Sequence, residues 1–186
     1  MDWRWRRQIV DDPLNIRRGN VTEIRIGGGS QQLLSTQDFV HTYASHQIWW
    51  PVGSQDVIFL RAEVGYTLAS SRFGIPQEYL FRAGGIQSVR GYDFKSIGVQ
   101  EGNAIVGGRT MATGTIEYTR WITHQWGAAA FADIGSAADS WQKMHPFIGY
   151  GGGVRWRSPA GPIALDLARA HETGTLRFHF SMAVAF

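Results

Sequence analysis

Cysteine is absent from the 186 residues, which excludes a disulfide scaffold, a thiolate metal site and a cysteine nucleophile. Also absent is any run of roughly 18 apolar residues, the length that a membrane-spanning helix requires. The first residues, MDWRWRRQ, lack the apolar core of a signal peptide, so we expect an envelope protein to be represented here by an internal start or an excised piece. Charge is scarce as well, because only 18% of the residues are charged, where about a quarter is usual.

Glycine and tryptophan are plentiful by comparison, with 23 and 8 residues. Together with the low charge, this composition suits a sheet with an apolar outer surface better than a water-soluble β-sandwich. The length is sufficient for one domain with a sizeable core. The formal net charge of +3 is too small to indicate a nucleic-acid partner, and we expect none.

Apolar and polar residues alternate with a period of two along much of the chain, which is the pattern of strands with two different faces. In 57–69, VIFLRAEVGYTLA, the even positions are apolar and the odd positions include Arg61 and Glu63. The final segment, 175–186, alternates almost perfectly and ends on Phe186. Weaker alternation extends over 20–29, 39–50, 109–122, 126–136, 147–157 and 162–169, and 3–9 is a candidate opening strand. The chain is therefore predicted to be all-β, with about eight or nine antiparallel strands.

The apolar face of these strands is broad and ends in aromatic residues, whereas the polar face carries glycine, alanine, threonine and few charges. Strands of about ten residues with aromatic ends are typical of transmembrane β-barrels, whose outside meets lipid. A soluble β-sandwich with an aromatic core is the alternative interpretation. Every backbone group of a sheet in a bilayer must be paired, so an odd strand count favours a fragment of a larger closed barrel. The candidates for an aromatic girdle are Trp3, Trp5, Trp49, Trp50, Trp121, Trp126 and Trp156.

One long segment, about 70–104, interrupts the strands. Hairpin loops are far shorter, and loops of this length are usually functional or disordered. The segment is rich in apolar and aromatic residues, which argues against disorder. We therefore expect it to fold into the barrel lumen.

Arg90 lies within this segment, in the stretch GGIQSVRGYDF. A guanidinium that is buried without a counter-ion is very costly, so Arg90 needs a carboxylate. Glu117 and Asp133 both fall on the polar faces of later predicted strands and are the candidates. The planar guanidinium can bind two carboxylate oxygens at once, and Gly91 permits a backbone turn and a close approach. Arg90 is therefore predicted to be the tip of an internal latch.

Several motifs resemble those of the outer-membrane assembly and secretion barrels, the superfamily that includes BamA, TamA and the two-partner secretion transporters. VRGY at 89–92, preceded by FRAGG at 81–85, is similar to the loop motif of that superfamily, and FADIG at 131–135 is similar to its FxDxG strand motif. The stretches ATGTIEYTRWITHQWGAAAFADIG, GGGVRWRSPAGPIALDLA and RAEVGYTLA look most like the TamA branch, whereas the ending FSMAVAF departs from it. The resemblance covers essentially the whole chain.

The resemblance implies a sixteen-stranded barrel in the bacterial outer membrane, with residues 1–186 as its C-terminal part and the periplasmic POTRA domains and first strands absent. It implies a factor that assembles and inserts outer-membrane proteins or autotransporters, with lipid, these clients and a periplasmic TamB-like protein as partners. The last strand would form the barrel seam and template client strands at its edge. The resemblance implies that Arg90 contacts Asp133, with Glu117 nearby and with Tyr92 and Phe131 packed around them. The site residues that it implies around the loop motif are Val89, Arg90, Gly91, Tyr92, Glu117, Phe131, Asp133 and Gly135. Those that it implies in the seam strand and assembly signal are Gly174, Phe178, Phe180, Met182 and Phe186.

Alternative functions stay open at this level. A secretion pore of the two-partner type shares the loop motif, and a passive porin-like barrel would have no need for it. The latch either stabilises the fold or gates the barrel, and the residues do not decide between the two. No nucleophile motif occurs and the six histidines show no metal-ligand spacing, so we predict no enzyme activity, metal or cofactor.

Overall fold

The computed structural model describes residues 2–30, 37–159 and 161–182. Within these ranges, nine strands form one sheet, and every neighbouring pair is antiparallel. The strand order in the sheet follows the order in the chain, which confirms the predicted all-β, antiparallel class. The strands are β1 (Asp2–Val10), β2 (Gly19–Gly29), β3 (Phe39–Val52), β4 (Asp56–Leu68), β7 (Thr110–Trp121), β8 (Trp126–Ala138), β9 (Phe147–Ser158), β10 (Gly161–Ala170) and β11 (Leu176–Met182).

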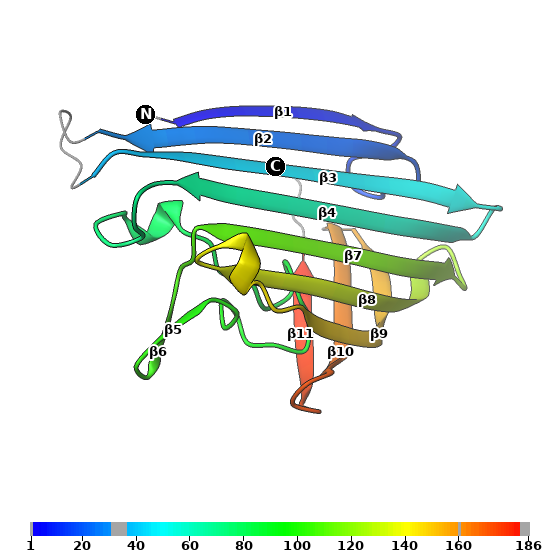
Figure 1. The fold of residues 1–186 in the computed structure, drawn as a ribbon. Helices are drawn as coiled ribbons and strands as arrows, with labels where there is room; N and C mark the ends of the chain where they lie inside the picture. The colour runs from blue at the N-terminus through cyan, green and yellow to red at the C-terminus, as the bar shows by residue number, and fades with distance from the viewer. Residues whose placement is uncertain (1, 31–36, 160, 183–186) are drawn as a thin grey trace.

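The sheet curls strongly, so that β9, β10 and β11 run at a steep angle to β1–β4 (Figure 1). In the described ranges β1 pairs only with β2, and β11 pairs only with β10. The nine strands therefore form an open, curved portion of a barrel wall. No helix in the same ranges is long and apolar enough to cross a membrane.

The two faces of the wall have opposite polarity. Large apolar side chains on one face are exposed, such as Val64 at 46% and Ile116 at 53%. The other face buries polar side chains, including Thr67, Thr113 and Asp133. Adjacent residues of a strand point to opposite faces, so this reversal follows directly from the period-two pattern. Apolar outside and polar inside is the arrangement of a transmembrane barrel.

The predicted aromatic girdle is wrong at two positions. Trp50 is 68% exposed on the outer face, and its neighbour Trp49 must therefore point inward, where its ring lies 4.9 Å from that of Phe59. Trp121 also faces inward, under the guanidinium of Arg157 at 3.5 Å. Trp126 stacks on Trp156, with ring centroids 5.3 Å apart. The remaining candidates for the girdle are partly or well exposed: Trp3, Trp5, Trp50, Trp126 and Trp156.

The long loop occupies residues 69–109, between β4 and β7. It contains the 3-10 turn η2 (Gln77–Tyr79) and a small hairpin of β5 (Val99–Glu101) and β6 (Ala104–Val106), which pair with each other away from the main sheet. The predicted boundary near 104 falls inside this hairpin, because three-residue strands leave too little alternation to detect. A second 3-10 turn, η3 (Trp141–Lys143), connects β8 to β9.

The loop folds back onto the polar face of the sheet. Bridges join Phe81 to Gly108 and Ala83 to Ile97, so the chain enters and leaves the inward portion side by side. A small apolar core forms there from Ala83, Val89, Tyr92, Ile97 and Ala170. The same loop contacts β7, β8 and β10 at once, which requires the polar face to be the concave one.

Candidate functional site

Arg90 is held by carboxylates from three strands. Its Nε and Nη2 donate to the two oxygens of Asp133 on β8, at 2.7 and 3.0 Å. Its Nη1 donates to Glu117 Oε2 on β7 at 2.8 Å and to Asp166 Oδ2 on β10 at 2.9 Å. The Arg90 backbone N–H also donates to Asp133, at 3.1 Å. Both the side chain and the backbone of the loop tip are thus fixed to the wall.

Arg155 on β9 is a second guanidinium that holds two of the same carboxylates. Its Nε donates to Glu117 Oε1 at 2.9 Å, and its Nη1 donates to Asp166 Oδ1 at 2.5 Å. We call these five residues the latch cluster: Arg90, Arg155, Glu117, Asp133 and Asp166. Two cations share Glu117 and Asp166, whereas Asp133 is bound by Arg90 alone in the described ranges.

The latch cluster is shielded from solvent. Arg90 is 5% exposed, Asp133 1% and Asp166 2%. Phe131 lies against the guanidinium, with the Arg90 Cζ 3.4 Å from the ring centroid, a cation–π contact. Burial alone would lower the pKa of Arg90, but the hydrogen bonds and charges of Asp133 and then Glu117 raise that pKa above its ordinary value.

A glycine track on the inner face of β9 makes room for the latch cluster. A Cβ at Gly149 would collide with the carbonyl oxygen of Arg90, and one at Gly153 would collide with the carboxylate of Asp166. Between them, a Cβ at Gly151 would collide with the Leu167 carbonyl oxygen of β10 and would also lie 2.9 Å from the ring of Phe131. The loop tip and two side chains of the site therefore occupy space that side chains of β9 would otherwise fill.

The turn that presents Arg90 requires glycine at position 91. Gly91 has a φ of 93°, in the left-handed region, and a Cβ on it would lie 2.7 Å from the Ala170 nitrogen. The preceding turn is closed by the Gly85 N–H, which donates to the Val89 carbonyl oxygen at 3.0 Å. The predicted glycine thus sits where the loop backbone presses against the end of β10.

FADIG on β8 contributes three residues to the contact with the loop. Asp133 binds Arg90, Phe131 lies under its guanidinium, and Gly135 faces Val89. A Cβ at Gly135 would lie 2.7 Å from the Val89 side chain, which is fully buried. The structure therefore brings together seven predicted residues: Val89, Arg90, Gly91, Glu117, Phe131, Asp133 and Gly135.

Tyr92 departs from the expected packing around the Arg90–Asp133 contact. Its ring packs edge-on against Phe147, with centroids 5.5 Å apart, and its hydroxyl donates to the Ile148 carbonyl oxygen at 3.3 Å. Gly91 lies between Arg90 and Tyr92 and turns the chain, so the two side chains leave the loop in different directions. Tyr92 fastens the loop to β9 and belongs to the apolar core of the loop.

The predicted seam residues lie apart from the latch cluster. Phe178, Phe180 and Met182 of β11 point outward and are 76%, 64% and 48% exposed. Gly174, with a φ of 69°, lies in the turn before β11 and donates its N–H to the Ala170 carbonyl oxygen at 2.9 Å. Phe186 falls outside the described residues.

Asp166 and Arg155 are the site residues that sequence reasoning missed. Both had a detectable signal, because each is a charged residue on the polar parity of a predicted strand. Asp166 lies between Leu165 and Leu167 in IALDLA, and Arg155 lies between Val154 and Trp156 in GGGVRWR. Nothing in the spacing indicated that the curled sheet would bring β9 and β10 up to Glu117.

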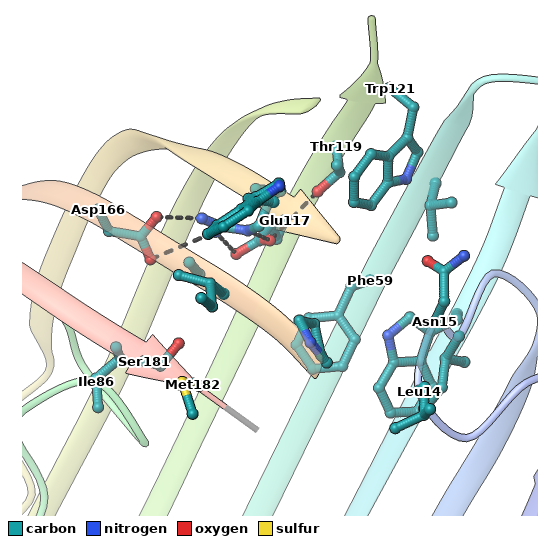
Figure 2. Close-up of a pocket in the computed structure, with 18 of the residues that line it drawn as sticks. Leu14, Asn15, Phe59, Ile86, Glu117, Thr119, Trp121, Asp166, Ser181 and Met182 are labelled. Carbon is teal, nitrogen blue, oxygen red and sulfur yellow. Dashed lines mark hydrogen bonds and ion pairs between the residues drawn. The ribbon is translucent and has the colours of Figure 1, made fainter. Parts of the chain in front are cut away.

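A pocket of about 450 Å³ opens beside the latch cluster. Figure 2 shows Glu117 and Asp166 at one side of it, Phe59 and Trp121 along the wall, and Ser181 near the end of β11. Within the described part of the chain, no three or more His, Asp or Glu side chains are grouped to hold a metal ion. The latch cluster beside the pocket is suited to holding the loop and the strands of the wall together.

Comparisons with known proteins agree with this architecture. The Omp85 superfamily domain matches residues 2–186. The outer membrane protein assembly factor BamA of Nitratidesulfovibrio vulgaris is 28% identical over 201 residues, which cover 98% of this chain and 25% of that protein. The crystal structure of BamA from Haemophilus ducreyi lacking POTRA domains 1–3 matches with a TM-score of 0.80 at 17% identity, over 96% of this chain and 41% of that one. The chain thus spans about a quarter of the length of the curated relative.

The structural match shows the barrel fold, and the domain match extends over nearly the whole chain. The narrower resemblance to the TamA branch stays a prediction. Fold and family together place the protein in the bacterial outer membrane, as an integral protein. The chain belongs to the Omp85 superfamily.

Proposed function

We propose that this chain is the C-terminal part of the barrel of an outer-membrane protein assembly factor. The observation that carries the proposal is the latch cluster, in which one arginine of the inward loop binds carboxylates from β7, β8 and β10. A passive barrel has no need of a loop fixed in this way. A protein named as an assembly factor aligns with 98% of the chain at 28% identity, which supports the same interpretation.

The edge of β11 is the proposed site of client contact. In the described ranges β11 has one strand neighbour, so its other edge carries backbone N–H and C=O groups open to a further strand. An incoming strand can pair with such an edge by β-augmentation, and pairing satisfies its backbone at membrane depth. Clients would be unfolded outer-membrane proteins or autotransporters with the same alternation of apolar and polar residues.

The latch cluster would hold the curvature of the wall that carries this edge. Four strands, β7 to β10, supply its carboxylates and Arg155, and β11 follows directly after β10. Loss of the cluster would allow these strands to shift relative to one another. The POTRA domains, the remaining barrel strands and a periplasmic TamB-like partner stay predictions from the resemblance.

Site-specific cross-linking in the full-length protein tests the client contact. The described wall contains no native cysteine, so a cysteine at Ser181 of β11 can be paired with one in the last strand of a client barrel. Ala130, on β8 in the middle of the wall, is the matched control position. We expect cross-links during client assembly at position 181 and none at position 130.

The proposal also predicts that the full-length protein in liposomes accelerates the folding of an added unfolded client barrel. Equal cross-linking at both positions would contradict strand templating. A protein that conducts ions without accelerating client folding would contradict the assembly function and would indicate a pore.

A further inference from the structure

The loop makes a second set of contacts, with β11, directly after the latch cluster. The Gly91 N–H donates to Nε2 of His179 at 2.9 Å. Two residues further along the loop, Asp93 forms an ion pair with Arg177 at 2.6 Å. His179 and Arg177 share the inner face of β11, because Phe178 between them points outward. The loop therefore holds the edge strand as well as the wall.

The bond to His179 fixes the protonation of the ring. A backbone N–H is a donor and never an acceptor, so Nε2 of His179 must carry the lone pair and the proton must be on Nδ1. A histidinium ring has donors at both nitrogens. Protonation of Nε2 would place two N–H groups against each other, and this contact would be lost.

The loop has little freedom to follow a ring that moves. The Gly91 backbone is pressed against the end of β10, where an added Cβ would lie 2.7 Å from the Ala170 nitrogen. Arg90, the residue before it, is held by three carboxylates. The position of the Gly91 N–H is thus fixed, and only a neutral His179 in its present position can accept from it.

Charged groups of both signs surround His179. Asp166 of β10 lies directly opposite His179 in the strand register. The other charged groups facing the ring are Asp133 of β8, Arg90 of the loop and Arg177 of β11 itself. Asp93 and Arg155 bind Arg177 and Asp166 in turn. Asp166 and Asp133 attract a histidinium, whereas Arg90 and Arg177 repel it.

We propose that His179 is a positioning residue that helps to tie the inward loop to the edge strand while it is neutral and weakens that tie when it is protonated. The role of the loosened strand rests on the proposed function, in which the β11 edge receives the client. The tie itself consists of the Gly91–His179 and Asp93–Arg177 contacts. Acidification would remove the first contact and leave the second, together with the latch cluster, in place.

Spin-label distances in the full-length protein, reconstituted in liposomes, test the tie. Labels at cysteines replacing Phe94 in the loop and Leu176 in β11 report on the two sides, and both side chains are exposed, at 68% and 61%. We expect one narrow distance at pH 8. As the pH is lowered stepwise from 8 to 5, ordinary carboxyl groups stay mostly ionised and the Asp93–Arg177 pair persists, so we expect a partial broadening of the narrow population as His179 becomes protonated.

His179→Gln is the matched variant, because a glutamine amide oxygen accepts a hydrogen bond and does not titrate in this range. The variant should keep the narrow distance at both pH values. An unchanged distance in the unsubstituted protein, or equal broadening in the variant, would overturn the proposal. Resistance of the folded barrel to SDS at room temperature confirms that each sample is folded.

Client cross-linking at Ser181, measured at both pH values, separates this proposal from the proposed function. Broadening together with altered cross-linking supports both. Broadening without any client cross-link at either pH supports the tie and overturns client contact at this edge.

Discussion

Two parts of the long loop at 69–109 are held in opposite ways. Most residues of 84–92 are buried against the wall, with Arg90 bound to three carboxylates and Val89 fully enclosed. The hairpin of 99–106 is mostly exposed, and its side-chain contacts with the rest of the described chain include the Arg72–Glu101 ion pair and a long hydrogen bond from Arg82 to the Ile105 carbonyl oxygen. The loop tip is thus fixed by buried charges together with the small apolar core, whereas the hairpin has few contacts. Four substitutions test this contrast.

The largest effect is expected for Arg90→Ala. The substitution leaves three carboxylates around a missing cation, and breaking a buried charge network of this kind costs about 3–5 kcal/mol. Urea unfolding of the full-length protein in detergent measures the loss. Arg82→Ala is the control, since Arg82 makes one long contact to the Ile105 carbonyl oxygen, at 3.5 Å. Equal stability of the two variants would show that the latch cluster does not hold the fold.

Gly149→Ala should come next, because the new methyl group collides with the Arg90 carbonyl oxygen. Overpacking of this kind typically costs about 1–3 kcal/mol, and here it would push the loop tip off β9. Gly114→Ala on β7 is the control, since its Cβ would lie 3.4 Å from the nearest atom. The same urea titration compares them. If the two alanines are equivalent, the glycine track does not seat the loop.

Arg155→Met distinguishes shared from unshared carboxylates. Glu117 and Asp166 lose one guanidinium but keep Arg90, so the loss should be that of charged hydrogen bonds, at most about 3 kcal/mol and smaller than for Arg90→Ala. Thermal loss of the SDS-resistant folded form ranks the two variants. A larger effect at Arg155 than at Arg90 would reverse the assignment of the central cation.

Glu101→Gln should have the smallest effect. The Arg72–Glu101 pair is partly exposed, and pairs of this kind contribute about 0–1 kcal/mol. Hydrogen exchange followed by mass spectrometry gives an independent comparison, with faster exchange expected over 99–106 than over 84–91. Protection of the hairpin equal to that of the loop tip would remove the contrast on which the comparison rests.

Local pattern was sufficient to predict most of the wall. Alternation located all nine strands of the main sheet, because a strand with one apolar and one polar face has apolar and polar residues in turn along its sequence. Parity also selected Glu117 and Asp133 as candidate partners of Arg90, since both had to face the lumen. These inferences needed only the direction of each side chain.

Contacts across the curled sheet were beyond such reasoning. Asp166 and Arg155 reach Arg90 or its partners because the wall bends, and curvature is not written in the alternation of any one strand. The predicted contact of Tyr92 was wrong for a related reason, since the turn at Gly91 directs its side chain toward Phe147. The sequence thus indicates which face a residue occupies more reliably than which residues meet there.

The glycine track of β9 has a mechanical consequence. A strand without inward side chains at 149, 151 and 153 can bend more sharply than its neighbours. Figure 1 shows the wall turning between β8 and β10, on either side of this strand. We expect β9 to act as a hinge, so that a change in barrel circumference bends the sheet mainly at this strand while the strands on either side move as rigid groups.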